Sequence, residues 1–489
     1  MLGLIPLLTA CLAGCVLLRL LRPAAGVGPG WATSLLELGL GVGFGIGLSS
    51  MLFFVLTVTG TATAATILLT DGAMLAALAA VWFYLRRRRP GAAVPVPAEG
   101  LVQPAYRYNW ILAALLISAL IIVLDGMRNQ AAADPHGMWD AWAIWNVRAR
   151  FLAGPGETWR NAISPLLERT HPDYPLLLSG FVARCWKVAG DYATIVPIAT
   201  ALVFFLATLA VLVAALALLR SASSGLLAGL TVMTGFTYLS QPMWQYSDIP
   251  LAYYYLAAVA LASLSWKAEE PRKPLLLFLA GYAAGCAAWT KNEGLLFAAV
   301  FGCCYAAADW LFSGFNPALR RSLWLAAGML PGLVLVGWLK MLAPVADPVV
   351  RAGKKGIAQG AAQSWRRQFV WRAIARNAGE FGYTPATHPL AALAIMAATL
   401  RFSLPRALRP AAVCGAAAVG LVFGGYVVVS LGAFTPFGRF FSQLFPLFLL
   451  VVFLALRPLE ELLEPAGAAP ATAPDAPKKR TKKKRSSRA

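Results

Sequence analysis

Runs of apolar residues alternate with short polar segments from the N-terminus to about Leu456. A helix needs about 20 consecutive apolar residues to span a bilayer, and runs of that length recur along the chain. The pattern predicts an all-α polytopic membrane protein with about 13 transmembrane helices. The expected spans are residues 2–22, 33–59, 64–85, 110–126, 192–219, 223–241, 249–265, 274–290, 294–312, 323–343, 388–401, 411–432 and 440–456.

The composition strengthens this prediction. Hydrophobic residues make up 59% of the 489-residue chain and charged residues 13%, whereas soluble domains are roughly 45–50% apolar. The first apolar run is too long for a signal-peptide core and has no basic residue ahead of it, so we expect it to remain as a span. Most of the seven cysteines fall within apolar runs, so a disulfide framework is not expected.

Positive charge is concentrated beside the expected spans. The formal net charge is +21, and much of the excess lies in the RRRR run at 86–89 and in the tail KKRTKKKRSSRA. Lysine and arginine beside a span mark the cytoplasmic side, where anionic lipid attracts them. We therefore expect topology signals rather than a nucleic-acid interface. Alternation from a cytoplasmic RRRR run places two long segments, 127–191 and 344–387, on the outer face.

Four regions follow from this layout. Residues 1–90 are expected to form a three-span N-terminal extension, and 91–109 a cytoplasmic linker. Residues 110–456 form the transmembrane core, and 457–489 a basic cytoplasmic tail. Because most of the unusual polar residues fall in the outer segments of the core, any chemistry is expected on that face.

The first outer segment contains HGMWDAWAIWNVRARF, which predicts a helix lying in the membrane interface. Asp140 would lie in its first turn, where a carboxylate either caps the helix or acts as a general base, and both roles stay open. Trp139 and its neighbouring tryptophans would lie at headgroup depth. Arg148 and Arg150 add positive charge to the same helix.

The same segment continues with ERTHPDYPLL, which carries His171, Asp173 and Tyr174. Prolines at positions 172 and 175 favour an extended backbone here. His171 and Asp173 could bind a sugar hydroxyl or a divalent metal ion, but two candidate ligands do not define a metal site.

Later spans carry ionisable residues at their outer ends. YSDIPLAYYY contains Asp248, and WTKNEGLL contains Lys291 and Glu293. GAFTPFGRFFSQLFP contains Arg439, a side chain suited to binding phosphate through paired donors. Such groups are costly in a membrane and usually face a cavity or a partner. Helix capping would explain them, and so would a single outer cleft shared with Asp140.

In this order, Asp140 followed by DYPLL, SDIPLAYY, TKNEG and GRFFSQLFP resembles the bacterial GT-C glycosyltransferases. That class is similar to protein O-mannosyltransferases and to the lipid A aminoarabinose transferase. The resemblance covers roughly 110–456 and implies a GT-C-like core with interfacial helices in the first large periplasmic loop. The N-terminal spans are extra, and a large soluble C-terminal domain is not seen. Ala141 stands where the family often has a second acid, so Asp134 and Asp248 are both candidates to assist Asp140.

The resemblance implies an inverting enzyme of the bacterial inner membrane, with its active site facing the periplasm. It would move a sugar from a polyprenyl-phosphate donor to a glycolipid, polysaccharide or protein acceptor. Asp140, assisted by Asp248, would remove the acceptor proton. The charge on the departing phosphate would be offset by Lys291 and Arg439, with help from Arg148 or Arg150. Further substrate contacts are expected from Trp139, His171, Asp173, Tyr174 and Glu293.

The expected partners are thus the lipid-linked donor, membrane lipid and the acceptor, with no nucleic acid. No GxGxxG or P-loop motif points to a nucleotide, and a divalent metal ion is left open as a cofactor.

Other functions remain as alternatives. A flippase or transporter of lipid-linked saccharides would use the same cations, but it should carry polar residues deep within several spans. An oligosaccharide polymerase or ligase would use a lipid-diphosphate donor with a long glycan. A purely structural membrane protein would leave the clustering of acids and cations on one face unexplained.

Overall fold

The computed structural model describes residues 2–88, 108–343, 356–385, 387–432 and 437–463, and every named element within them is a helix. Ten of these helices are long and apolar enough to cross a membrane. The chain is therefore an all-α polytopic membrane protein. The ten are α1 (Leu4–Leu21), α2 (Gly30–Val58), α3 (Ala64–Arg88), α4 (Asn109–Ala133), α7 (Ile195–Leu219), α10 (Asp248–Lys267), α12 (Asn292–Ser313), α13 (Phe315–Leu342), α17 (Arg409–Gly432) and α18 (Phe437–Ala455).

The other three expected spans are helical but shorter or less apolar. The span expected at 223–241 is broken into α8 (Ala222–Val232) and α9 (Phe236–Ser240). The one expected at 388–401 is the 12-residue α16 (Pro389–Leu400). α11 (Lys273–Thr290) has 18 residues but is less apolar than the ten. A total of 13 spans therefore stays a prediction.

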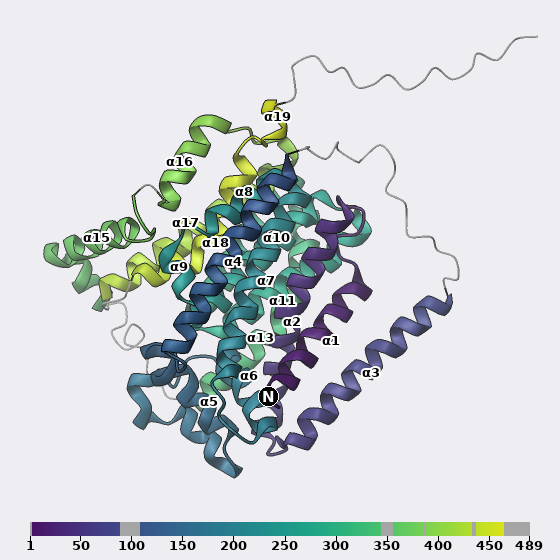
Figure 1. Ribbon diagram of the computed structural model, residues 1–489, viewed down its shortest axis with the longest axis vertical. Coiled ribbons are helices and arrows are strands. Elements are labelled where there is room, and N and C mark those ends of the chain that lie inside the picture. The colour runs from purple at the N-terminus through teal and green to yellow at the C-terminus, as the bar shows by residue number, and fades with distance from the viewer. Residues whose placement is uncertain (1, 89–107, 344–355, 386, 433–436, 464–489) are drawn as a thin grey trace, which may run out of the picture.

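Helix α10 lies at the centre of the bundle (Figure 1), and its residues from Asp248 to Ser265 are all buried. It packs against α2, α7, α11, α17 and α18. The hydroxyl groups of Tyr253 and Tyr254 donate to backbone carbonyls of α2, at Gly39 (2.9 Å) and Gly43 (2.8 Å). Glycine permits this approach, because a Cβ at Gly43 would lie 2.2 Å from the Tyr253 ring.

These contacts make α1 and α2 part of the same bundle as the expected core, since α1 packs on α2 and α2 packs on α7. Helix α3 lies at the periphery (Figure 1), where it contacts α1 and α6 (Leu177–Ala189). The boundary at residue 90 stays a prediction. Most of the linker 91–109 and of the tail 457–489 lies outside the described residues, as do 344–355 and 386 of the second outer segment.

The segment between α4 and α7 folds into several short helices at the lower end of the bundle in Figure 1. A π-helical turn, Ala141–Trp145, leads into α5 (Asn146–Ala153), and 3₁₀ turns at Gly156–Ile163 and Pro165–Thr170 precede α6. The single expected helix is thus divided. α6 was not expected, and it is buried from Leu177 to Trp186 because it packs on α1, α2, α3 and α5.

The remaining described elements are peripheral. α15 (Ser364–Gly379) contacts α17 and α18 and extends to the left of the bundle in Figure 1. α19 (Glu460–Leu463) follows α18, and 3₁₀ turns lie at Glu270–Arg272 and Arg406–Leu408.

Candidate functional site

Five helices place their polar ends at the same end of the bundle. α10 begins at Asp248, and Arg439 lies in the first turn of α18. Lys291 joins the end of α11 to the start of α12, and Lys340 lies in the last turn of α13. Polar residues from distant parts of the sequence therefore meet here. We call the group the charged cluster: Asp140, Asp173, Asp248, Lys291, Glu293, Lys340 and Arg439.

Asp248 is the most enclosed member of the charged cluster, with no exposed surface. Its Oδ1 accepts hydrogen bonds from Lys291 Nζ (3.2 Å) and Gln443 Nε2 (2.5 Å), and its Oδ2 accepts one from Arg439 Nε (2.9 Å). A buried carboxylate requires such compensation, and its place in the first turn of α10 is favoured by the helix dipole. Asp248 therefore fixes the positions of two cations.

Asp140 joins the same network from the segment between α4 and α7. Its Oδ2 lies 2.6 Å from a terminal nitrogen of Arg439, although the pair lacks the alignment of a hydrogen bond. Arg439 thus bridges two carboxylates, whereas Asp140 retains capacity to accept from a further donor. The adjoining π-helical turn, Ala141–Trp145, is a form often found at functional sites.

Lys291 links Asp248 to a third acid, Glu293. Lys291 Nζ lies 2.9 Å from Glu293 Oε1 and 5.9 Å from the centre of the Tyr174 ring. The other oxygen of Glu293 is buried and has no hydrogen-bond partner among the described residues. Glu293 therefore also retains capacity to accept from a further donor.

Asp173 forms the edge of the charged cluster with two residues that sequence reasoning missed. Its Oδ2 accepts from Asn292 Nδ2 (3.0 Å) and Lys340 Nζ (3.2 Å), and Lys340 also donates to Asn292 Oδ1 (2.8 Å). The available signal for Lys340 was a charged residue near the end of an apolar run, which is the same signal that identified Asp248. Gln443 was missed because its amide carries no charge.

Three aromatic rings support this edge. Tyr174 stacks on His171, with ring centres 4.5 Å apart, and on Trp145 at 5.9 Å. The expected substrate residues His171, Asp173 and Tyr174 therefore lie together beside Lys291.

Tyr246 is another residue that sequence reasoning missed, although it begins the YSDIPL motif. Its ring faces the Arg439 guanidinium at 4.9 Å. Burial raises the pKa of its hydroxyl, and the nearby Asp140 carboxylate raises it further, while Arg439 acts in the opposite direction.

Arg148 is fully buried. Its guanidinium donates to three backbone oxygens, those of Ala162 (3.0 Å), Pro172 (3.2 Å) and Tyr174 (2.7 Å). Burial lowers its pKa to about 10, and Asp173 partly opposes that shift. The structure thus places Arg148 behind the charged cluster, where it holds the Tyr174 backbone, rather than in a position facing a phosphate.

Three other candidates lie apart from the charged cluster. Arg150 is exposed on α5 and faces the Tyr192 ring at 5.3 Å. Trp139 is exposed and packs edge-on against Trp142. Asp134, one candidate for the second carboxylate, is exposed and accepts from Gln130 on α4. Of the two candidates, only Asp248 shares a partner with Asp140.

No group of three or more histidine, cysteine, aspartate or glutamate side chains is arranged to hold a metal ion within the part of the chain that the structure describes.

Comparison of the chain with protein-family models, with curated proteins and with solved structures finds no match in any of the three.

Proposed function

We propose that the protein is an inverting, membrane-embedded glycosyltransferase of the GT-C type, which transfers a sugar from a polyprenyl phosphate to an acceptor. The observation that carries the proposal is the bridge that Arg439 makes between Asp140 and Asp248, with Lys291 on the same Asp248 carboxylate. Transfer from a lipid phosphate needs a base and fixed positive charge at the ends of the spans, and this network contains both.

In the proposed reaction, an acceptor hydroxyl oxygen bonds to the anomeric carbon of the donor sugar. The bond from that carbon to the phosphate oxygen breaks, and the polyprenyl phosphate leaves with the electron pair. Asp140 takes the acceptor proton. Lys291 and Arg439 offset the charge that grows on the phosphate, while Asp248 positions both cations.

The pairing of Arg439 with Asp140 suggests an order of events. A donor phosphate that binds Arg439 competes with Asp140 for the same guanidinium nitrogen, 2.6 Å from Asp140 Oδ2. Asp140 then gives up its cation and becomes free to accept the proton of the acceptor. Donor binding would thereby precede activation of the base.

The distribution of basic residues supports a site on the periplasmic face of the bacterial inner membrane. Arg220, Lys267 and Arg409 lie at the helix ends opposite the charged cluster. Positive residues favour the cytoplasmic side, so this distribution favours the exterior for the charged cluster.

The test is sugar transfer from a panel of radiolabelled polyprenyl-phosphate sugars, using membranes that contain the native protein or Asp140→Asn. Asp125→Asn is the matched control, because Asp125 is an exposed carboxylate of α4 that pairs with Arg128. We expect transfer by the native protein and the control only. Transfer that persists in Asp140→Asn contradicts the assigned base.

Further arms of this assay separate the alternatives. Movement of the donor between leaflets without transfer would replace the proposal with a flippase. Turnover restricted to lipid-diphosphate glycans would replace it with a polymerase or ligase. A chelator added to the native protein tests for a divalent metal cofactor.

A further inference from the structure

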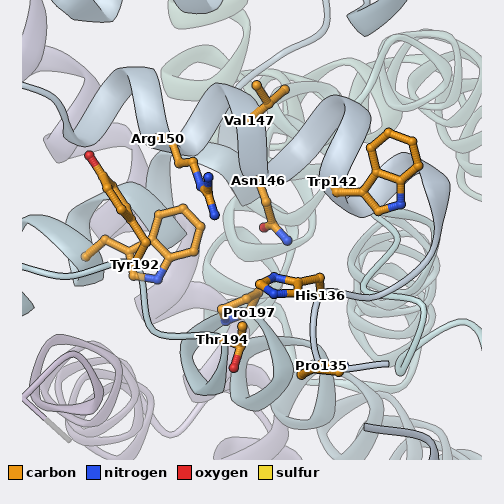
Figure 2. A pocket seen from close by; sticks show the side chains of 10 residues that line it. Pro135, His136, Trp142, Asn146, Val147, Arg150, Tyr192, Thr194 and Pro197 are labelled. Carbon is orange, nitrogen blue, oxygen red and sulfur yellow. The ribbon is translucent and has the colours of Figure 1, made fainter. Parts of the chain in front are cut away.

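A cavity lies near the charged cluster, between α5 and the start of α7, with a volume of about 140 Å³ (Figure 2). None of the side chains that line it is a carboxylate. Its lining consists of Pro135, His136, Trp142, Asn146, Val147, Arg150, Trp186, Tyr192, Thr194 and Pro197.

The lining combines aromatic surface with polar groups. Trp142, Trp186 and Tyr192 provide rings, and Asn146 and Thr194 provide groups that both donate and accept hydrogen bonds. An apolar cavity of about 150 Å³ holds one benzene molecule, so a cavity of about 140 Å³ accommodates the six-membered ring of one sugar. The hydroxyl and carboxyl groups of that sugar would extend along the exposed rim formed by Trp142, Arg150 and Tyr192. Flat aromatic faces combined with amide and hydroxyl groups suit a sugar ring, which has both apolar faces and hydroxyls.

Arg150 adds the charge preference. Its guanidinium faces the Tyr192 ring at 5.3 Å, and no carboxylate within the described ranges forms an ion pair with it. Figure 2 shows Arg150 and His136 directed toward the same cavity. A planar guanidinium matches a carboxylate through paired donors, so an acidic sugar is favoured over a neutral one.

The cavity adjoins the charged cluster through one short wall. Asn146, which lines the cavity, donates to Gln245 Oε1 at 3.1 Å. The next residue, Tyr246, faces Arg439. A small second cavity lined by Asn146, Gln245 and Tyr246 continues this wall. A sugar ring held beside Asn146 would therefore be separated from Arg439, the partner of Asp140, by Gln245 and Tyr246.

We propose that this cavity binds one acidic sugar unit of a saccharide acceptor, and that Arg150 selects the acidic unit. This inference rests on the proposed glycosyl transfer only in assigning the bound sugar to an acceptor. The binding itself requires no donor and no turnover.

The test uses the purified full-length protein in lipid nanodiscs and measures binding of methyl glucuronide and methyl glucoside by calorimetry. We expect the glucuronide to bind at least tenfold more tightly, since a charged hydrogen bond accounts for about that difference. Arg150→Gln should weaken glucuronide binding about tenfold and leave glucoside binding unchanged. Trp142→Ala should weaken both, and because Trp142 is 53% exposed the fold should survive.

The matched control is Arg160→Gln. Arg160 belongs to the same segment, its side chain is 62% exposed, and its guanidinium also faces an aromatic ring, Trp159, at 4.8 Å. It does not line the cavity, so both sugars should bind this variant as they bind the native protein.

Three results would overturn the proposal: binding of neither sugar, equal binding of both, or equal loss of glucuronide binding in the Arg150 and Arg160 variants. Asp140→Asn separates this inference from the proposed reaction. That variant should bind the glucuronide normally even though transfer is lost, so a failure of transfer leaves the binding result intact.

Discussion

Two fully buried aspartates lie at opposite ends of the bundle, and each accepts hydrogen bonds from three side chains. Asp248 accepts from Lys291, Arg439 and Gln443. Asp309, near the end of α12, accepts from Trp266 (3.0 Å), Ser313 (2.9 Å) and Arg321 (3.2 Å).

The two networks differ in what lies beyond the first partners. Beyond the partners of Asp309, Arg321 pairs with Glu270, an exposed residue that also pairs with Lys273. Around Asp248, by contrast, the partners continue to two further carboxylates, Asp140 and Glu293, each with a buried oxygen atom that has no hydrogen-bond partner among the described residues. Near Asp309 the unsatisfied buried atom is the hydroxyl of Tyr305, which is neutral. A buried ion pair is therefore weak evidence for a site, whereas buried carboxylate oxygens that remain unsatisfied around it are stronger evidence.

The sharpest test of this difference is Asp140→Asn, for which we expect the largest effect. The amide keeps the shape of the side chain but cannot take a proton, so transfer should fall by about 10²–10⁴-fold. Thermal unfolding of the purified variant should change little, because Arg439 keeps its ion pair with Asp248 and the Asp140 Oδ2 atom accepts no hydrogen bond. A loss of transfer that merely parallels a loss of folded protein would assign Asp140 a structural role instead.

The opposite behaviour is expected of Asp309→Asn. Loss of the charge weakens the bonds from Trp266 and Arg321, and Arg321 is only 16% exposed, so the variant should lose about 1–3 kcal/mol of stability. Unfolding temperature measures that loss, and the transfer rate per folded molecule should equal the native rate. A transfer defect in this variant would remove the contrast between the two ends of the bundle.

Much of the bundle follows from the sequence because lipid imposes a simple rule on it. Ten expected spans are helices long and apolar enough to cross a membrane, since a backbone in hydrocarbon must satisfy its own hydrogen bonds. The rule says less about short helices. The break between α8 and α9 and the buried α6 depend on packing against other helices rather than on hydropathy.

The charged cluster was predicted in part for a related reason. A charge within an apolar run is conspicuous, which identified Asp248, Lys291 and Arg439, and alternation of the spans placed them on one face. The roles expected of Arg148 and Arg150 were harder to judge from sequence. Both lie on α5, and only the fold shows that Arg148 donates to backbone oxygens while Arg150 lines the cavity between α5 and α7.

A smaller effect is expected for Lys340→Gln. Lys340 is 34% exposed and bonds to Asp173, so it adds positive charge at the edge of the charged cluster, where a donor phosphate would approach. Its removal should raise the KM for the polyprenyl-phosphate donor about tenfold, with kcat changed less. Steady-state kinetics against donor concentration measures both. Equal effects of Lys340→Gln and Lys273→Gln, a lysine at the opposite end of the bundle, would show a general charge effect instead.

The smallest effect is expected for Tyr246→Phe, which removes a hydroxyl but keeps the ring that faces Arg439 at 4.9 Å. The pKa of the Tyr246 hydroxyl is raised above its ordinary value, so the hydroxyl stays protonated at neutral pH and cannot act as a base there. Transfer should therefore fall by only a few fold, and its pH dependence near neutrality should match that of the native protein. Tyr246→Leu removes the ring as well and should weaken donor binding further, because the cation–π contact contributes about 1–2 kcal/mol where it is desolvated. A changed pH profile in Tyr246→Phe would move the proton-accepting role from Asp140 to Tyr246. The difference between the Asp248 end and the Asp309 end of the bundle would then depend on Tyr246 rather than on the unsatisfied carboxylates.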